Sequence, residues 1–125
     1  MENLIKKAKN YYIAGEIAER IGNFDVASTN YFKSLSAIND FILSTINFFP
    51  RDHGERFDML KDKFPNFYKV TSSLFLTYRR AYTKEITKEE TITLKERLKE
   101  AFTNAKIEIP KNEEINNAIK KAFKK

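Results

Sequence analysis

The apolar residues of this chain recur at steps of three and four, and this spacing constrains the fold more than any other feature of the sequence. The pattern is clearest between Ala27 and Phe49, where Tyr31, Leu35 and Ile38 fall on one face of a helical wheel. A period near 3.6 residues indicates an α-helix, whereas a half-buried strand needs strict alternation of apolar and polar residues. Such alternation is almost absent, so the sequence predicts an all-α protein.

Glycine, proline and capping residues predict where the first helices begin and end. Gly22 stops a first helix, and Asn23 or Asp25 can cap a second one. Pro50 is expected to end that second helix, because the residue before a proline is pushed out of helical geometry. Pro65 then separates a short third helix from a fourth.

Two further helices follow the fourth. The sequence TKEE at residues 87–90 is a capping box, and Pro110 and Asn112 start a last short helix. Because short connections favour antiparallel neighbours, we expect an up-and-down antiparallel bundle of four to six helices. It should form a single domain over residues 1–125, in which the short basic helix at 111–125 is a candidate for a peripheral position.

The composition excludes several kinds of site. The chain has no cysteine and one histidine, so it lacks the ligands of ordinary zinc sites and cannot form disulfides. Its three glycines are too scattered for a phosphate-binding loop. We therefore expect no metal and no cofactor, and an enzyme is the less favoured class. The lack of cysteine agrees with a cytoplasmic location. The longest mainly apolar window, residues 37–49, is interrupted by polar residues, so we expect a soluble protein without a membrane partner.

The distribution of charge points to a possible partner. The net charge is +6, and the excess lies in residues 66–86 and 110–125, which carry +3 each. A basic patch suggests an anionic partner such as RNA, although a lysine-rich surface can also be merely solvated. The candidate nucleic-acid-binding residues are Lys69, Arg79, Arg80, Lys84, Lys120, Lys121, Lys124 and Lys125.

The stretch FFPRDHGERFDMLKDKFP contains the single histidine of the chain, His53. One interpretation is helix capping, in which Asp52 is the N-cap, Glu55 closes a capping box and His53 falls on the apolar side of the helix. The other is a catalytic cluster in which His53 acts with Arg51 or Arg56. Capping explains most of these charges, and both interpretations of the histidine stay open.

The stretch AGEIAERIGNFDVASTNYFKSLSAI is similar to a single tetratricopeptide repeat. A shift of about 34 residues, the length of that repeat, gives no second copy, and such arrays need about three. We interpret the similarity as a helix hairpin with small residues where the helices cross. The aromatic and small positions of the motif are matched by Tyr11, Gly15, Gly22, Ala27 and Tyr31.

A longer resemblance covers roughly residues 8–105. It rests on the joint GNFDVA, the aromatic-rich helix YFKSLSAINDFI, the stretch RDHGERFDMLKDKFP, the segment LFLTYRRAY and the capped helix TKEETITLKERLKEAF. Together these features resemble the HEPN superfamily of small prokaryotic helical-bundle proteins. The resemblance implies a bundle that often dimerises. In several members it also implies a ribonuclease of a toxin–antitoxin or defence system.

The nuclease signature of that superfamily is an arginine followed, after four to six residues, by a histidine. The window after Arg79 and Arg80 reads AYTKEITK and holds no histidine, and positions 46–48 ahead of His53 hold no arginine. The resemblance therefore implies a member without the nuclease motif, to which ribonuclease activity does not carry over.

Three functions are consistent with these features. The leading hypothesis is a non-catalytic interaction or assembly protein, which the resemblance implies is a homodimer. In it, Leu76 lies on the outward side of the fourth helix among basic residues. The first alternative is an RNA-binding protein of a toxin–antitoxin or defence-type system. The second is a degenerate ribonuclease that uses His53.

Overall fold

The computed structural model describes residues 2–123, and this range folds into six α-helices with no strand. The predicted all-α bundle is therefore confirmed. Lys124 and Lys125, two of the predicted nucleic-acid contacts, lie outside the described residues. The helices are α1 (Glu2–Arg20), α2 (Phe24–Ser44), α3 (His53–Lys63), α4 (Pro65–Arg80), α5 (Lys88–Asn104) and α6 (Asn112–Phe123).

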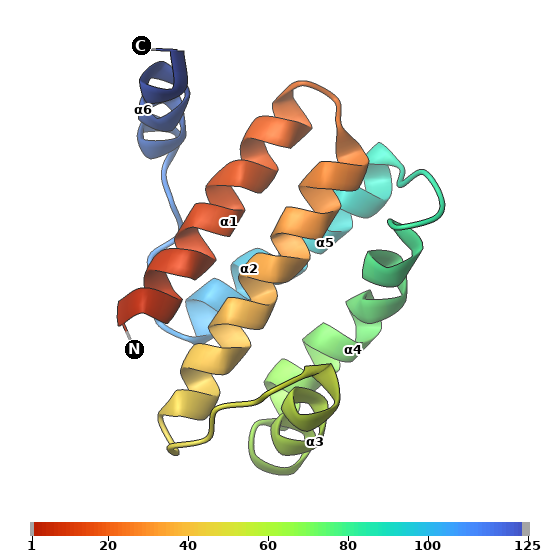
Figure 1. Ribbon diagram of the computed structural model, residues 1–125, viewed down its shortest axis with the longest axis vertical. Coiled ribbons are helices and arrows are strands. Elements are labelled where there is room, and N and C mark those ends of the chain that lie inside the picture. The colour runs from red at the N-terminus through yellow and green to blue at the C-terminus, as the bar shows by residue number, and fades with distance from the viewer. Residues whose placement is uncertain (1, 124–125) are drawn as a thin grey trace.

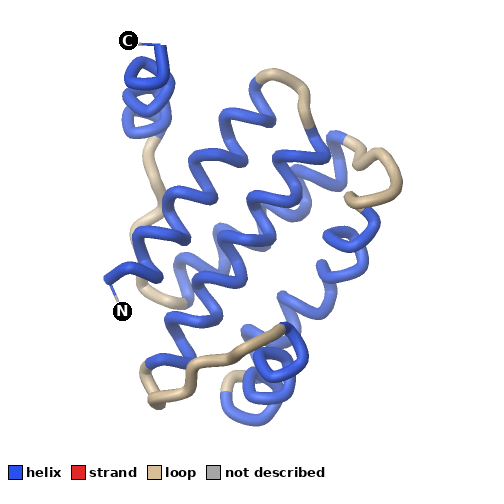
Figure 2. Tube along the Cα trace, in the orientation of Figure 1, coloured by secondary structure: helices blue, strands red, loops and turns tan. Residues whose placement is uncertain are grey.

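Helix α2 lies at the centre of the bundle (Figure 1). Helix α1 runs beside it as the other arm of a hairpin, α5 crosses behind, and α3 and α4 pack together on the side of α2 away from α1. Helix α6 packs against α1 at the edge of the molecule. Loops and turns make every connection within the described range (Figure 2).

The core forms where the apolar faces of these helices meet. Tyr31, Leu35 and Ile38 of α2 are fully buried, as are Leu98 and Phe102 of α5. These are positions that the three- and four-residue spacing assigns to the inside. Burial of a large aliphatic or phenyl side chain stabilises a fold by about 1.5–3 kcal/mol, so this central layer supplies much of the stability.

Helix α1 comes very close to α2 at Gly15, where a Cβ atom would overlap the ring of Tyr31. The Tyr31 hydroxyl donates to Glu19 Oε1 at 2.7 Å, and Lys95 Nζ of α5 lies 3.1 Å from both Glu16 Oε1 and Glu19 Oε2. Burial and then the bond to Glu19 raise the pKa of Tyr31, so the hydroxyl stays a donor. These groups tie α1 to α2 and α5 and are already paired with one another.

The second helix ends earlier than Pro50 predicts. Helix α2 stops at Ser44, and Asn47 adopts a left-handed backbone with φ of 61°. The amide of Asn47 donates to Ser44 O at 3.0 Å, and that of Phe48 to Leu43 O at 3.1 Å. This is a Schellman motif, which satisfies the last carbonyl groups of a helix, with asparagine in the position that glycine usually takes.

Helical spacing assigns Ile46, Phe49 and Ile92 to the core side, but all three are exposed. Ile46 and Phe49 follow the end of α2, and Phe49 is 66% exposed. In α5, Thr91 faces inward, and the Thr91 hydroxyl lies 3.0 Å from the Ser28 hydroxyl. The next residue, Ile92, is therefore exposed. Two other helix signals are confirmed: the left-handed Gly22 ends the first helix, and the capping box at residues 87–90 starts α5.

Candidate functional site

His53 lies in a groove of about 300 Å³ that runs over α2, between α1 and the end of α4. Four helices contribute side chains to it, and ligand sites in helical bundles often lie between helices in this way. We call it the His53 groove. Its polar and aromatic lining includes Lys7 and Tyr11 of α1, Lys33 and Asp40 of α2, His53 of α3 and Tyr78 of α4.

Arg56 holds the His53 ring in place. Arg56 Nη1 donates to His53 Nδ1 at 2.7 Å, while Arg56 Nε and Nη2 donate to the two carboxylate oxygens of Asp40 at 2.6 and 3.1 Å. The rings of Phe75 and Tyr78 lie with their centroids 5.6 and 6.0 Å from that of His53. Helices α2, α3 and α4 thus meet around this histidine, on the apolar side of α3 as the spacing predicts.

These contacts determine which nitrogen of His53 carries the proton. A guanidinium can only donate, so Nδ1 is the acceptor and the ring proton is on Nε2. Burial, and then the charge of Arg56, lower the pKa of His53 and favour the neutral ring. Nε2 makes no hydrogen bond within the described residues, and it is not buried, because the one buried unpaired side-chain atom in that range is Asn39 Oδ1. His53, which lines the groove, therefore carries an N–H donor that is accessible and unpaired within the described residues.

The same contacts weigh against a catalytic cluster. A general base needs a free lone pair, but Nδ1 of His53 is occupied by Arg56 and Nε2 carries the proton. Arg51 pairs instead with Glu55, whose carboxylate accepts from both the backbone amide and the guanidinium of Arg51. Glu55 therefore does not close the predicted capping box, although Asp52 does cap α3. Of the two arginines predicted beside His53, the structure brings only Arg56 to it.

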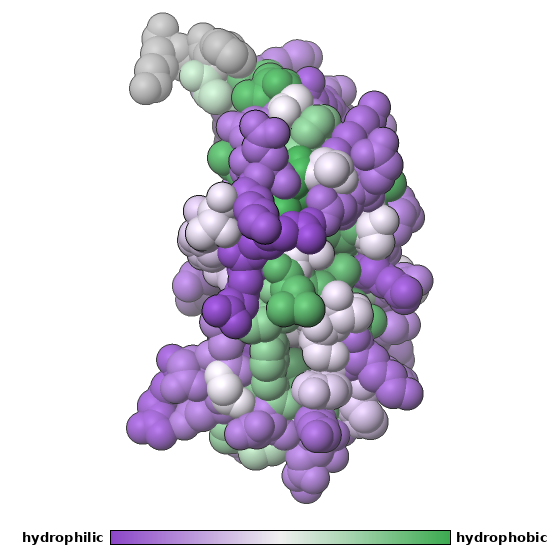
Figure 3. Space-filling view, turned by 90° about the vertical axis from the view of Figure 1, so that its right-hand side faces the viewer, coloured by the Kyte–Doolittle hydropathy of each residue, from purple (hydrophilic) through white to green (hydrophobic). Residues whose placement is uncertain are grey.

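The outward side of α4 is a second candidate surface, which we call the α4 basic face. Leu76 is 75% exposed at its centre. Figure 3, which looks onto this side of the molecule, shows an apolar band between hydrophilic side chains. The α4 basic face consists of four residues of α4 and one of the loop after it, all of them exposed: Lys69, Leu76, Arg79 and Arg80, with Lys84.

Most of the charge on the α4 basic face is uncompensated. Arg80 pairs with Glu90 at the start of α5, and the Arg79 guanidinium lies 5.9 Å from the centroid of the Phe75 ring. Neither Lys69 nor Lys84 forms an ion pair within the part of the chain that the structure describes. Helix α4 itself contains no acidic residue, so this side of the molecule favours an anionic partner.

Tyr82, which follows α4, does not lie on the side to which helical spacing assigns it. Helical spacing assigns Tyr78 and Tyr82 to the core side, but Tyr82 is 66% exposed. Its hydroxyl lies 2.7 Å from that of Tyr78. Burial, and then this contact, raise the pKa of Tyr78 to about 12. The helix ends at Arg80, so the spacing no longer applies at Tyr82.

The predicted nucleic-acid residues do not form one surface. Lys120 and Lys121 are exposed on α6, which packs against α1. Helix α4 lies on the far side of the bundle from α6 (Figure 1). Two separate basic regions therefore exist in the described range, and Lys124 and Lys125 lie beyond it.

A hollow of about 330 Å³ lies between α3 and the loop before it, and we call it the α3 acidic hollow. Its apolar lining comes from Phe48 and Met59. Three acidic side chains surround that lining, two of them exposed: Glu55, Asp58 and Asp62.

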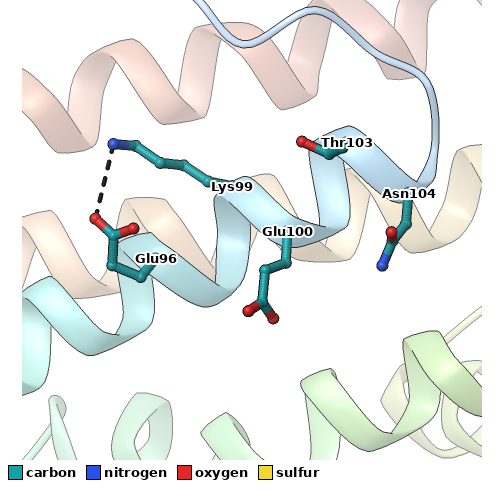
Figure 4. A pocket seen from close by; sticks show the side chains of 5 residues that line it. All are labelled: Glu96, Lys99, Glu100, Thr103 and Asn104. Atoms are coloured by element: carbon teal, nitrogen blue, oxygen red, sulfur yellow. Dashed lines mark ion pairs between the residues drawn. The ribbon is translucent and has the colours of Figure 1, made fainter.

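A wider depression of about 420 Å³ on the outer side of α5 lacks the features of a site. Figure 4 shows that its side chains project from α5 alone, with Lys99 directed towards Glu96, whose Oε1 lies 3.7 Å from Lys99 Nζ. Within the described range, no group of three or more potential ligands could hold a metal ion. No helix in that range combines the length and apolarity needed to span a bilayer.

Sequence reasoning missed most of the groups that accompany His53. Asp40 lies in a mainly apolar stretch of α2, and an acid in such a place is a signal for a partner, which proves to be Arg56. Lys7 and Lys33 gave no signal, because lysines are common on helix surfaces and these two come together only through packing. Scans against protein-family models and searches of curated proteins and of solved structures found no match.

Proposed function

We propose that this chain is a non-catalytic interaction protein that assembles with a second copy of itself through the outer side of α3 and α4. One observation carries the proposal: α3 and α4 pack together, and on their sides away from α2 they present the α4 basic face, with its exposed Leu76, and the α3 acidic hollow, with its apolar lining. The two surfaces are unlike in charge, although Glu55 is paired with Arg51 and Asp62 Oδ2 lies 3.6 Å from Lys63 Nζ, and each surface has an apolar centre. The resemblance to HEPN proteins, which often dimerise, agrees with this proposal.

Both surfaces lie on the sides of their helices that face away from α2. Thr71 and Tyr78 contact α2 through Asn39 and Phe32, and helical spacing places Leu76 on the opposite side of α4. On α3 the acidic residues likewise lie opposite Leu60, which is fully buried. A two-fold rotation can therefore set each basic face on the acidic hollow of the other copy and close the contact as a dimer.

Pairing of α4 directly with α4 is less favourable. That helix contains no acidic residue, so two copies would bring like charges together. Contact between the basic face and the acidic hollow opposes unlike charges and covers Leu76.

Light scattering over a concentration series tests the assembly. Leu76→Glu should weaken the dimer at least about tenfold, because a buried apolar centre dominates most interfaces. Ile21→Glu is the matched control, since Ile21 is 76% exposed after α1 and lies outside the proposed contact. A wild-type chain that stays monomeric at high concentration, or equal effects of the two variants, would contradict the proposal.

Charge reversal gives a sharper test. A variant with Lys69→Glu and Arg79→Glu should not dimerise, and neither should one with Asp58→Lys and Asp62→Lys, because each then opposes like charges. Mixed together, the two variants should form a heterodimer in which both contacts again join unlike charges. If the mixture stays monomeric while the wild type dimerises, the copies meet through another surface.

RNA binding by the α4 basic face is the second candidate, and the exposure of Tyr82 favours it. An exposed aromatic ring beside basic residues can stack on an unpaired base. Binding through phosphate contacts should weaken steeply as salt rises. RNA retardation at low and moderate salt, with an Arg79→Ala/Arg80→Ala variant, tests this. Equal behaviour of variant and wild type would exclude this surface.

A further inference from the structure

We propose that the His53 groove binds a small molecule that carries a carboxylate or phosphate group on an apolar or aromatic body. This site is separate from the α3 and α4 surfaces of the proposed assembly and does not depend on them.

The polar groups that the groove leaves unpaired are donors or hydroxyls. His53 presents Nε2–H, because Arg56 occupies Nδ1. Lys7 and Lys33 form no ion pair within the described residues, and both line the groove. A ligand that fits must supply acceptors, and an oxyanion supplies the strongest ones, since charge-assisted hydrogen bonds are roughly twice as strong as neutral ones.

Asp40, an acid in the lining, does not reverse this preference. Both of its carboxylate oxygens accept hydrogen bonds from Arg56, at 2.6 and 3.1 Å. The pair is neutral overall, and its bidentate geometry holds the Asp40 carboxylate of α2 against Arg56 of α3. The uncompensated charge of the groove therefore comes from Lys7 and Lys33, on two adjacent helices.

The walls of the groove fit an apolar or aromatic body. Phe32 and Tyr78 lie nearly parallel, with an interplanar angle of 14° and ring centroids 4.3 Å apart. On the α1 side, Lys33 Nζ lies 5.9 Å from the centroid of the Tyr11 ring. The volume of about 300 Å³ is at the lower end of the range for ligand pockets, about 300–1,000 Å³, which favours a small molecule.

Titration of the full chain with benzoate and with phenyl phosphate, followed by NMR, tests the proposal. At least one of the two should shift the resonances of His53 and Lys33, and comparison of the two shows which oxyanion fits better. Benzyl alcohol is the neutral control and should bind at least about tenfold more weakly, because it cannot form the charge-assisted bonds. Equal binding of the alcohol, or no binding of either anion, would overturn the proposal.

Variants locate the site and separate it from the proposed assembly. Lys33→Ala should weaken anion binding about tenfold, the usual result of losing one charge-assisted contact, and leave the dimer unchanged. Lys69→Ala, on the α4 basic face, should weaken the dimer and leave anion binding unchanged. If Lys69→Ala weakens anion binding as much as Lys33→Ala does, the anions bind as counterions to basic surface and the groove is not the site.

A pair of substitutions tests the donor role of His53. His53→Gln keeps an N–H donor near the position of Nε2 and should retain most of the affinity, whereas His53→Phe keeps the packing and should lose it. Far-UV circular dichroism confirms that both variants fold. Equal affinities of the two folded variants would remove His53 from the site.

Discussion

At His53 the protonation state of one ring is set by neighbours from three helices. Burial and the charge of Arg56 lower its pKa, and Asp40 and Asp52 offset this in part. In the unfolded chain the pKa of His53 is 6.5, above that of the folded chain. As the pH falls below this value, His53 is therefore protonated to a larger extent in the unfolded chain than in the folded one. The charged and titratable groups around the ring and its groove are Lys7, Tyr11, Lys33, Asp40, Asp52, Arg56 and Tyr78.

The expected result is a loss of stability on mild acidification. The free energy of unfolding should fall as the pH drops below about 6.5, and this contribution should level off below the lowered pKa of the folded state. Urea unfolding between about pH 5 and 8 measures it, and the single histidine lets NMR follow the same titration directly. His53→Gln is the control, since it should remove this part of the pH dependence. An unchanged profile in that variant would show that other groups cause it.

Gly15 is a second residue with a specific steric role. Gly15→Ala should lower the free energy of unfolding by about 1–3 kcal/mol, because the new Cβ overlaps the buried Tyr31 ring. Helix propensity alone would give the opposite sign, since alanine favours a helix by about 1 kcal/mol over glycine. Urea unfolding of Gly15→Ala shows whether the steric overlap or the helix propensity has the larger effect on stability. Stabilisation by Gly15→Ala would mean that Tyr31 moves aside at little cost.

Between elements, α2 and α4 are joined by an incompletely satisfied polar contact. Asn39 Nδ2 donates to Thr71 Oγ1 at 2.7 Å, while the buried Asn39 Oδ1 has no partner. Thr71→Val should cost about 1–3 kcal/mol, because Nδ2 then also lies buried without an acceptor. Asn39→Leu has nearly the same shape and should cost much less, or stabilise the protein. Thermal unfolding of both variants checks this order, and the reverse order would show that Oδ1 is satisfied in solution.

The helices themselves could be predicted from the sequence more fully than the ends of some of them. Apolar spacing, Gly22 and the box at residues 87–90 predict helices that the structure contains, because these signals act within a few residues. The end of α2 predicted from Pro50 is wrong, because the helix stops earlier, at a Schellman motif in which Asn47 takes the left-handed position. Asparagine is a weaker stop signal than glycine, so the sequence did not reveal this end. The inward turn of Thr91 likewise depends on Ser28, a partner distant in sequence.

At the scale of the whole molecule, α6 is the element with the slightest attachment. Ile115 is buried, and Arg20 Nη1 and Nη2 donate to Asn116 Oδ1 and Asn112 Oδ1 at 2.8 and 3.3 Å. Removal of residues 112–125 should cost about 1.5–3 kcal/mol, the value for one large apolar side chain, and should leave cooperative unfolding of the rest. Circular dichroism with urea measures both. Loss of cooperative unfolding would show that α6 is integral to the core.

The candidate sites depend on this whole-molecule arrangement, which explains why the sequence revealed them only in part. His53, Arg56 and the residues of the α4 basic face could be named, because unusual residue types or runs of charge mark them. The groove could not, since Lys7 and Lys33 come from separate helices and acquire a shared role only when α1 packs on α2. Complementarity between the basic face and the acidic hollow likewise needs the orientation of both helices.

The pairing of helices that are neighbours in sequence, α1 with α2 and α3 with α4, has a kinetic consequence. A short loop joins the two helices of each pair, so bringing them together costs little conformational entropy. Proteins rich in local contacts cross a lower barrier than those that must join distant strands, and helical bundles typically fold in microseconds to milliseconds. The attachment of α5 to α2 is the main long-range step. Substitutions such as Leu98→Ala at that contact should therefore slow refolding, whereas the loss of Ile115 at the periphery should mainly accelerate unfolding.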